Sequence, residues 1–488
     1  MRLNKYILSI ILLAAALAYT LWFVFAGFGN HQDPLYWLYK YESLEGGWMA
    51  VGTLLTGGTI VRLFGAQFLP LRLFGWACVV AAISFPYCCL LNREQRRENL
   101  HWLAFAYLLM GYGAFQEFSP GTLSVLLLSA LWVTHSPIVL GLAVAARFPN
   151  ILALLVLIPV WKKKSLRNIP IAMLSAGVIY LLGYLFITPS PMDAAMTSHD
   201  LMAMLSKLWE NSGKLILYAL MAVGVLAFKD KKFVGYLMGV LVALVVVYTI
   251  KPMQWYNTDL TYLISAFVLV IALDRKQYLG AALLAVATLG TDTAWLKLFP
   301  AVLCLLPVAL TKYETVTEKR YWYEVLCVLC VVTVLRMTTN SVGQTNLMRT
   351  ETFSSVAPYQ GIAIRESEKQ RLEQFRADYD SLCTVHHTSY TILAVGQECH
   401  LMRVVTGCEA ARFNEFWSNI FDSVYTAKYC EIIHAEHPVV FCSFSPQFKT
   451  KPEYKDKESR MEKMLLEEGY QAIDRSNYKY MIYIPTDN

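Results

Sequence analysis

The first two-thirds of this chain is a succession of apolar runs, and this feature limits the possible fold more than any other. A helix that crosses a bilayer core needs about 20 apolar residues. Only 16% of the residues are charged and the mean hydropathy is +0.42, whereas soluble proteins carry about 25% charged residues. The pattern predicts a mostly α-helical protein with about 13 transmembrane helices. The expected spans are residues 6–28, 69–91, 100–116, 120–135, 137–147, 150–161, 168–188, 214–228, 233–250, 259–273, 278–290, 297–311 and 324–338.

The positions of Lys and Arg predict the direction of these spans. Alternate connections are basic, and the connections between them carry little positive charge apart from Lys40, Lys207, Lys251 and Lys297. Basic connections stay on the cytoplasmic side of a membrane, so thirteen spans place the N-terminus in the cytoplasm and the C-terminus outside. We expect a bacterial inner membrane, because the outer connections contain no Asn-x-Ser/Thr sequon. The basic residues are Arg2, Lys5, Arg93, Arg96, Arg97, Lys162, Lys163, Lys164, Arg167, Lys229, Lys231, Lys232, Arg275, Lys276, Lys312, Lys319 and Arg320.

The chain changes character near residue 340. Residues 1–339 contain 26 Lys/Arg and 16 Asp/Glu, whereas residues 340–488 contain 16 Lys/Arg and 20 Asp/Glu. The formal net charge of +6 therefore comes from the apolar part of the chain. It does not indicate a nucleic-acid-binding surface. In the tail, candidate strands alternate with candidate helices, which is typical of a small α/β domain. We therefore expect a transmembrane domain over 1–339 and a periplasmic α/β domain over 340–488. The candidate strands are 390–395, 401–405, 439–444 and 478–484, and the candidate helices are 364–382, 414–424 and 458–468.

The cysteines and histidines indicate no metal centre. Cys327 and Cys330 have the spacing of a redox or metal motif, but within an apolar run they are expected to be packing residues. The tail histidines have no accompanying ligand set with zinc spacing. The tail cysteines would lie in an oxidising space, where one or two disulfides with open pairing are expected. They are Cys383, Cys399, Cys408, Cys430 and Cys442.

Two carboxylates stand at the outer ends of predicted spans. Asp33 follows the first span almost directly, and Glu117 lies in a very short turn before the fourth. A carboxylate near the bilayer is costly to desolvate, so its presence there suggests a functional role. Two of them at one membrane face can act as a general base and as a metal or acceptor ligand. The alternative is that both are solvated loop acids or helix caps.

The stretch from the first span to the second resembles the polytopic glycosyltransferases of the GT-C class, among them protein mannosyltransferases and the lipid A aminoarabinose transferase. In these proteins an Asp follows the first helix, and an interfacial helix and a Pro-Leu-Arg start of the second helix come next. The corresponding features here are Asp33, residues 46–65 and Pro70-Leu71-Arg72. Glu117 matches an acid that the family carries in a short outer turn. Many members have a second acid after the first Asp, where this chain has Pro34.

The resemblance implies transfer of a sugar from a polyprenyl-phosphate donor to a lipid, glycan or protein acceptor at the periplasmic face. Asp33 would be the general base, with Glu117 as the second catalytic carboxylate. No cofactor is assigned and no protein partner is expected, and a divalent metal is left open. The leaving phosphate needs positive charge, for which the candidates are Arg72, Arg147 and Lys251, and the candidates for lining the lipid or sugar site are Trp255 and Tyr256.

Other interpretations stay open at this point. Arg147 could instead snorkel to lipid phosphate, and Trp255 and Tyr256 could be ordinary interface aromatics. A carrier or flippase for a lipid-linked saccharide is the main functional rival, although transporters tend to show paired repeats and this chain shows no internal repeat. A surface polysaccharide polymerase or ligase would use the same type of donor.

Overall fold

The computed structural model divides into two compact units. Unit 1 comprises residues 1–29, 43–63 and 69–350, and unit 2 comprises residues 30–42, 64–68 and 351–488. The predicted tail domain therefore shares its unit with two short segments from the first 70 residues. The structure describes residues 2–25, 32–110, 118–189, 209, 212–213, 215–223, 258–289, 294–311, 352–364, 366–386, 392–395, 405–406, 423–443, 462–475, 477 and 480–486.

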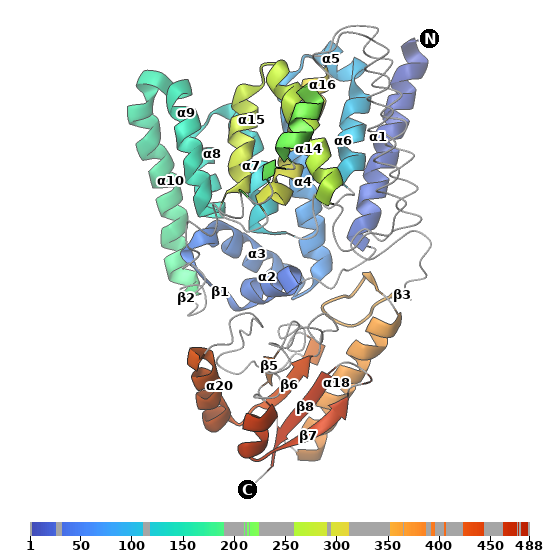
Figure 1. The fold of residues 1–488 in the computed structure, drawn as a ribbon, viewed down its shortest axis with the longest axis vertical. Coiled ribbons are helices and arrows are strands. Elements are labelled where there is room, and N and C mark those ends of the chain that lie inside the picture. Colours follow the sequence, from blue (N-terminus) through green and yellow to red (C-terminus); the bar gives the residue numbers. More distant parts are fainter. Residues whose placement is uncertain are drawn as a thin grey trace. The chain divides into compact units, whose positions relative to one another are not determined.

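Unit 1 is a bundle of helices whose bounds follow the predicted spans closely (Figure 1). Within the part of the chain that the structure describes, three runs are long and apolar enough to cross a membrane, namely Tyr6–Phe25, Phe68–Leu90 and Phe148–Phe186, which favours membrane association. The predicted spans 233–250 and 324–338 lie outside the described residues. The helices are α1 (Arg2–Phe25), α4 (Phe68–Leu90), α6 (Leu100–Met110), α7 (Pro120–Thr134), α8 (Pro137–Ala146), α9 (Ala153–Trp161), α10 (Ser165–Phe186), α14 (Thr258–Asp274), α15 (Tyr278–Ala285) and α16 (Ala294–Thr311).

The ends of α7 show how local chemistry sets the helix boundaries. Ser119 caps the helix by accepting the backbone N–H of Thr122, whose hydroxyl accepts the N–H of Ser119 in return, and Pro120 occupies the first turn. The helix ends at His135, which has a positive φ of 51°. Pro137 then starts α8, because proline fixes φ near its helical value and needs no partner for a missing N–H. The chain therefore reverses between α7 and α8 within two residues.

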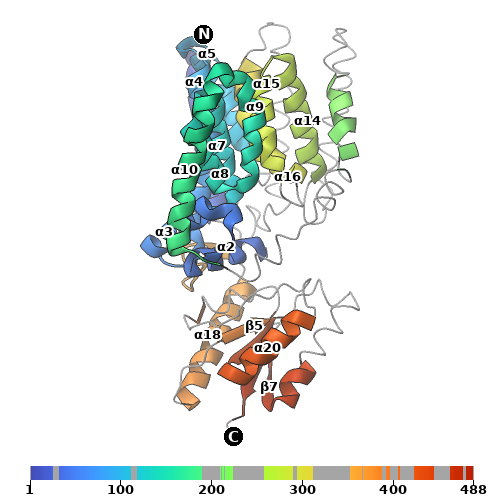
Figure 2. The ribbon, with the colours of Figure 1, turned by 90° about the vertical axis from the view of Figure 1, so that its left-hand side faces the viewer.

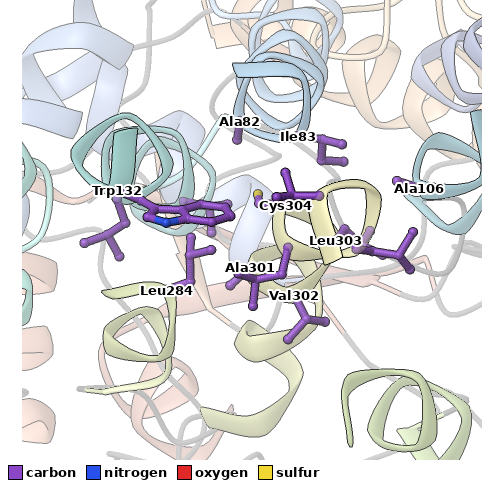
Figure 3. Close-up of a cluster of buried hydrophobic side chains, with 14 of the residues drawn as sticks. Ala82, Ile83, Ala106, Trp132, Leu284, Ala301, Val302, Leu303 and Cys304 are labelled. Atoms are coloured by element: carbon purple, nitrogen blue, oxygen red, sulfur yellow. The ribbon is translucent and has the colours of Figure 1, made fainter. Parts of the chain in front are cut away.

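Polar side chains connect α4 to two neighbouring helices, α1 and α7. Trp76 Nε1 donates to Thr20 Oγ1 of α1 at 3.0 Å, and Ser129 Oγ of α7 donates to the carbonyl of Ala82 at 2.6 Å. The apolar centre of the unit lies beside these contacts, where Trp132 of α7, Leu284 of α15 and Cys304 of α16 meet (Figure 3). Ser and Thr hydroxyls thus hold helices whose packing surface is otherwise apolar, as is common between membrane helices.

The basic connections gather at one end of unit 1. The N-terminus of α1, the short helix α5 (Arg93–Glu98), the three-lysine turn η3 (Lys162–Lys164) and the turn from α14 to α15 all lie at the upper end in Figures 1 and 2. The guanidinium of Arg97 lies 4.8 Å from the centre of the Tyr6 ring, which joins two of these connections. This arrangement agrees with the predicted alternation of basic and non-basic connections.

The opposite end of unit 1 joins two connections that are far apart in the sequence. After α2 (Gln32–Ser43), strand β1 (Glu45–Gly46) pairs in parallel with β2 (Thr188–Pro189), which follows α10. The helix η1 (Trp48–Ala50) and α3 (Val51–Phe64) come next, and the hydroxyl of Thr53 donates to the carbonyl of Ala146 at the end of α8. The stretch between the first and second predicted spans is therefore paired with residues 188–189, at the end of the seventh predicted span.

Unit 2 is built on a four-stranded sheet. The strands are β5 (Ile392–Val395), β6 (Val439–Ser443), β8 (Tyr480–Pro485) and β7 (Tyr470–Arg475) in that spatial order, and only β5 and β6 are parallel. The helices are α18 (Glu366–His386) and α20 (Ser423–Glu436). Phe375 of α18 packs on Phe441 and Tyr480, with ring centres 4.4 Å and 5.2 Å apart. Of the predicted strand 401–405 only Val405 is described, and it is helical.

The segment before α4 belongs to unit 2. Strands β3 (Thr352–Phe353) and β4 (Ala363–Ile364) form a small hairpin. Within its loop, the carbonyl of Pro358 accepts the N–H of Phe68 at 2.9 Å, and the rings of Phe68 and Tyr359 lie 5.2 Å apart. The loop that leads into the second predicted span is thus bound to the start of the tail.

Candidate functional site

Three segments of unit 1 meet where the sequence predicts the outer ends of its spans. One guanidinium nitrogen of Arg72, Nη2, donates to the carbonyl of Phe23 at the end of α1. The N–H of Phe118, just before α7, donates to the carbonyl of Leu71 at 2.8 Å. We call these four residues the α1–α4–α7 junction. It brings the Pro-Leu-Arg sequence next to Phe118, the first described residue after Glu117, although the two are far apart in the sequence.

Arg72 is the cation of this junction. Its side chain is only 6% exposed, and an arginine offers five N–H donors and cannot lose its charge in a protein. A buried guanidinium is stable only where its charge is compensated by acceptors. The contact with Phe23 therefore gives Arg72 a structural role, since it connects α4 to the end of α1, and its role at a phosphate remains a prediction.

Of the two predicted catalytic carboxylates, Asp33 lies in a described helix and Glu117 does not. Asp33 is the second residue of α2 and belongs to unit 2. The side chain of Asp33 lies outside what the structure describes, so the alternative that it is a solvated loop acid or a helix cap stays open. Glu117 lies outside the described residues, directly before Phe118 of the junction.

Among the described residues, the partners of the Arg147 guanidinium are backbone carbonyls. Its Nη1 donates to the carbonyl of Ala287 at 2.7 Å and its Nη2 donates to the carbonyl of Leu289 at 2.5 Å. These carbonyls belong to the middle residue of η4 (Val286–Thr288) and to the residue directly after it. Arg147 thereby ties the end of α8 to the end of α15. Its proposed role at a phosphate remains a prediction.

The turn that contains Arg147 is held by a second polar contact. Asn150 is fully buried, and its amide group donates to the carbonyl of Ala143 at 2.8 Å and exchanges hydrogen bonds with Ser124 Oγ. A buried amide costs free energy unless it is hydrogen-bonded, and here both of its ends are paired. The α8–α9 turn is therefore a rigid part of the same end of unit 1.

Three other predicted binding residues cannot be placed. Lys251, Trp255 and Tyr256 lie outside the described residues, so their role at the lipid or sugar site remains a prediction. Among the residues that the structure describes, no group of three or more His, Cys, Asp and Glu side chains is arranged to hold a metal ion.

Lys40 is a buried cation that the sequence interpretation did not assign to the site. It is 1% exposed, and its ammonium nitrogen lies 5.3 Å from the ring centre of Tyr36 and 5.9 Å from that of Tyr39. A cation over aromatic rings is stabilised by their negative faces. The signal was present in the sequence, because Lys40 breaks the charge alternation and follows an aromatic stretch. It lies seven residues after Asp33, which is about two turns along α2.

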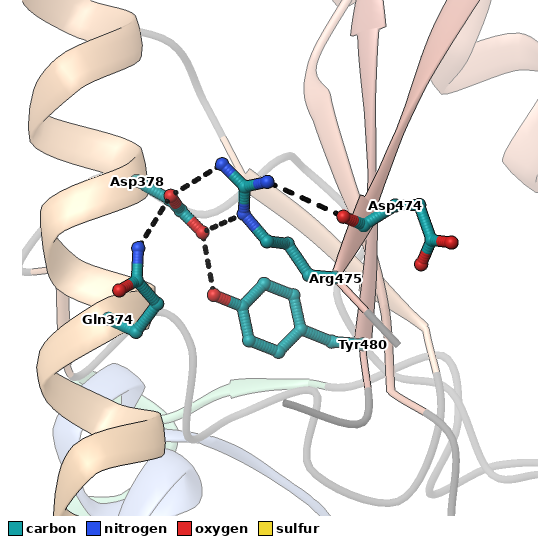
Figure 4. A network of polar contacts seen from close by, with 5 residues as sticks. All are labelled: Gln374, Asp378, Asp474, Arg475 and Tyr480. Atoms are coloured by element: carbon teal, nitrogen blue, oxygen red, sulfur yellow. Dashed lines mark hydrogen bonds and ion pairs between the residues drawn. The ribbon is translucent and has the colours of Figure 1, made fainter. Parts of the chain in front are cut away.

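Figure 4 shows an aspartate of the tail, Asp378, whose carboxylate oxygens accept four hydrogen bonds. Asp378 of α18 accepts hydrogen bonds from Arg475 Nε at 2.8 Å and Nη2 at 3.1 Å, from the Tyr480 hydroxyl at 2.7 Å and from the Gln374 amide at 3.0 Å. Burial raises the pKa of Asp378, but the hydrogen bonds from Arg475, Tyr480 and Gln374 outweigh it and hold the pKa below its ordinary value. All acceptor positions of this carboxylate are used, so Asp378 connects α18 to the sheet and is no candidate for catalysis.

The described cysteines of the tail form no disulfide with one another. Cys383, Cys430 and Cys442 all retain their thiols, and Cys430 Sγ lies 3.1 Å from Met464 Sδ. Cys399 and Cys408, like Cys327 and Cys330 of the apolar part, lie outside the described residues. The predicted pairing therefore stays open.

Comparison of the sequence with models of protein families and with curated proteins finds no match. The function must therefore be inferred from the residues themselves. The α1–α4–α7 junction is the feature on which we base this inference, since it connects Arg72 and its neighbour Leu71 to the ends of two other helices.

Proposed function

We propose that this protein is a GT-C-like glycosyltransferase of a bacterial inner membrane. It transfers a sugar from a polyprenyl-phosphate donor to a lipid, glycan or protein acceptor at the periplasmic face. The single observation that carries the proposal is the α1–α4–α7 junction, because it unites Arg72 and the turn after Glu117 at the end of unit 1 away from the basic connections.

The reaction needs one proton transfer and one displacement. The Asp33 carboxylate takes the proton of an acceptor hydroxyl or amine, and the freed electron pair attacks the anomeric carbon of the sugar. The bond from that carbon to the phosphate oxygen breaks, and its electron pair leaves with the polyprenyl phosphate. A single displacement inverts the configuration, and the transition state has oxocarbenium character.

Positive charge at the leaving group assists this reaction. The phosphate oxygen gains negative charge as the sugar departs, and a preorganised cation stabilises that charge in the transition state. Arg72, Arg147 and Lys251 are the candidates, and Arg72 is the one that belongs to the junction. Trp255 and Tyr256 are proposed to contact the sugar or the polyprenyl chain.

The test is sugar transfer by the purified full chain in nanodiscs. The probes are undecaprenyl phosphates that carry different single labelled sugars, and an extract of envelope lipids and glycans supplies the acceptor. We expect labelled product and an equal amount of released undecaprenyl phosphate. Asp33→Asn and Glu117→Gln should each lower the rate at least about 100-fold, which is typical of a lost general base. Glu98→Gln, an exposed acid on α5, should leave the rate unchanged.

Two results would contradict the proposal. One is full sugar transfer by folded Asp33→Asn and Glu117→Gln variants, which would remove both carboxylates from the mechanism. The other is movement of the intact lipid-linked sugar across a liposome membrane without release of undecaprenyl phosphate. That second result would identify a carrier without chemistry of its own.

A further inference from the structure

The hairpin of α9 and α10 has an outer face that no described part of the chain covers. Its apolar side chains are widely exposed, with Leu155 at 69%, Leu166 at 88% and Leu174 at 70%. The opposite side of α10 packs closely on α8, because a side chain at Gly141 would meet the backbone of Ala172. Helix α6 is equally apolar on all sides and is almost entirely buried. The exposure of α10 is therefore a property of its place in the bundle and not of its composition.

The tip of this hairpin is a cluster of exposed cations. Lys162, Lys163, Lys164 and Arg167 stand in and just after η3, and all four are exposed. Residues 153–186 contain no Asp or Glu that could neutralise them. Lys162 has a positive φ of 51°, so the chain reverses at this residue and presents the lysines at the end of the hairpin. The cations thus lie at the end of the same hairpin that exposes the aliphatic side chains.

The other end of α10 carries aromatic side chains. The Trp48 ring lies 6.5 Å from that of Tyr184, at an angle of 18°, and 6.4 Å from that of Tyr180. Tryptophan and tyrosine are enriched where a membrane meets water. From Lys164 to Tyr184 the helix rises about 30 Å at 1.5 Å per residue, which is close to the thickness of a hydrocarbon core. The surface thus has a basic end, an apolar middle and an aromatic end.

We propose that the outer face of the α9–α10 hairpin is a binding surface for anionic phospholipid. The lipid phosphate binds Lys162, Lys163, Lys164 and Arg167, and the acyl chains lie along the exposed aliphatic side chains of α9 and α10. Charge and apolar surface both fit this ligand, because a phospholipid offers an anionic head directly above its apolar chains. This binding goes beyond sugar transfer and does not depend on it.

The experiment measures lipid retention by the full chain in neutral detergent. Phosphatidylglycerol and phosphatidylcholine with identical acyl chains are added in equal amounts, and bound lipid is counted by native mass spectrometry. We expect the wild-type chain to retain phosphatidylglycerol at least about tenfold more than phosphatidylcholine, since each basic residue near a membrane surface contributes to anionic lipid binding. The triple variant K162Q/K163Q/K164Q should lose most of this preference, and K162R/K163R/K164R should keep it.

A matched control separates the hairpin from the general positive charge of this end. The double variant R93Q/R97Q removes two cations of α5 and should retain the wild-type preference. Equal retention of both lipids by the wild-type chain would overturn the proposal. An unchanged preference in the triple glutamine variant would do the same, and so would an equal loss in R93Q/R97Q.

Discussion

At the scale of single residues, Asp378 shows how a buried charge is made stable. Its carboxylate is 8% exposed, whereas the Arg475 side chain that it binds is 36% exposed. The Tyr480 hydroxyl belongs to a fully buried side chain. An amide at this position would place an NH2 group against donors of Arg475 or Tyr480 where a carboxylate oxygen now accepts, and an unsatisfied buried hydrogen-bonding group costs about 1–3 kcal/mol.

We predict that Asp378→Asn lowers the free energy of opening of α18 and β8 by roughly 2–3 kcal/mol. The measurement is hydrogen exchange of peptides from these two elements in the full chain. Asp380→Asn is the matched control, because Asp380 is exposed and its contact with Arg376 is long, at 3.8 Å. An exposed pair of this kind contributes at most about 1 kcal/mol, so the control should exchange almost as the wild type does.

The pH dependence of this effect has a definite sign. The pKa of Asp378 is lowered in the folded state from its ordinary value of 3.8, so the carboxylate stabilises the domain fully above that value. The contribution is lost as the pH falls through the lowered folded pKa. The difference in exchange between wild type and Asp378→Asn should therefore be constant from pH 7 to pH 5 and shrink only below about pH 4. A difference that vanishes near pH 6 would contradict the role of this carboxylate.

At the scale of elements, helix packing in unit 1 depends on small residues. A side chain at Gly141 of α8 would lie 2.5 Å from the carbonyl oxygen of Ala172 and 2.9 Å from the N of Ala176, both in the backbone of α10. Backbone atoms cannot turn away as a flexible side chain can. The two helices therefore approach as closely as they do because position 141 has no Cβ.

Gly141→Ala should accordingly force α8 and α10 apart and destabilise the protein by about 1–3 kcal/mol, seen as a lower midpoint of thermal unfolding in detergent. Gly177→Ala is the control on α10, where a Cβ would meet nothing within 4 Å. That variant should leave the midpoint unchanged or raise it, since alanine favours the helix by up to about 1 kcal/mol. Equal midpoints for the two variants would show that the close contact is absent.

Most helices and three strands of this structure could be predicted, and the failures have physical reasons. Strand β7 was missed because it is an edge strand, bonded only to β8, and its sequence Tyr470–Arg475 offers little apolar alternation. Helix α3 was expected only as part of an interfacial stretch, since its length of 14 residues is below that of a span. Hydrophobic periodicity predicts long, apolar helices and strands well, and it predicts short or half-polar ones poorly.

The site could be predicted only as a set of positions. The sequence singled out Asp33, Glu117 and Arg72, but the backbone bond between Phe118 and Leu71 depends on tertiary packing that no local pattern encodes. The same is true of Arg147, whose carbonyl partners lie 140 and 142 residues further along the chain. Lys40 was recognisable as an exception to the charge pattern, although not as a buried cation.

At the scale of the whole molecule, the grouping of basic connections makes the proposed orientation testable. In a background in which the eleven native cysteines are replaced by alanine, single cysteines are placed at Lys163 and at Thr188, both exposed. A membrane-impermeant maleimide should label Thr188→Cys in intact cells. It should label Lys163→Cys only after the membrane is permeabilised, because basic connections face the cytoplasm. Labelling of Lys163→Cys in intact cells would reverse the orientation.

The central claim is that this chain transfers a sugar at the periplasmic face. If so, a glycan or lipid of the cell envelope carries the transferred sugar. The measurement is mass spectrometry of envelope glycans and lipids from cells without the gene, complemented by the wild-type chain or by Asp33→Asn. We predict that one sugar substituent is missing in the deleted cells, returns with the wild-type chain and stays absent with Asp33→Asn at equal protein level. A substituent that returns fully with Asp33→Asn, or an envelope unchanged by the deletion, would contradict the claim.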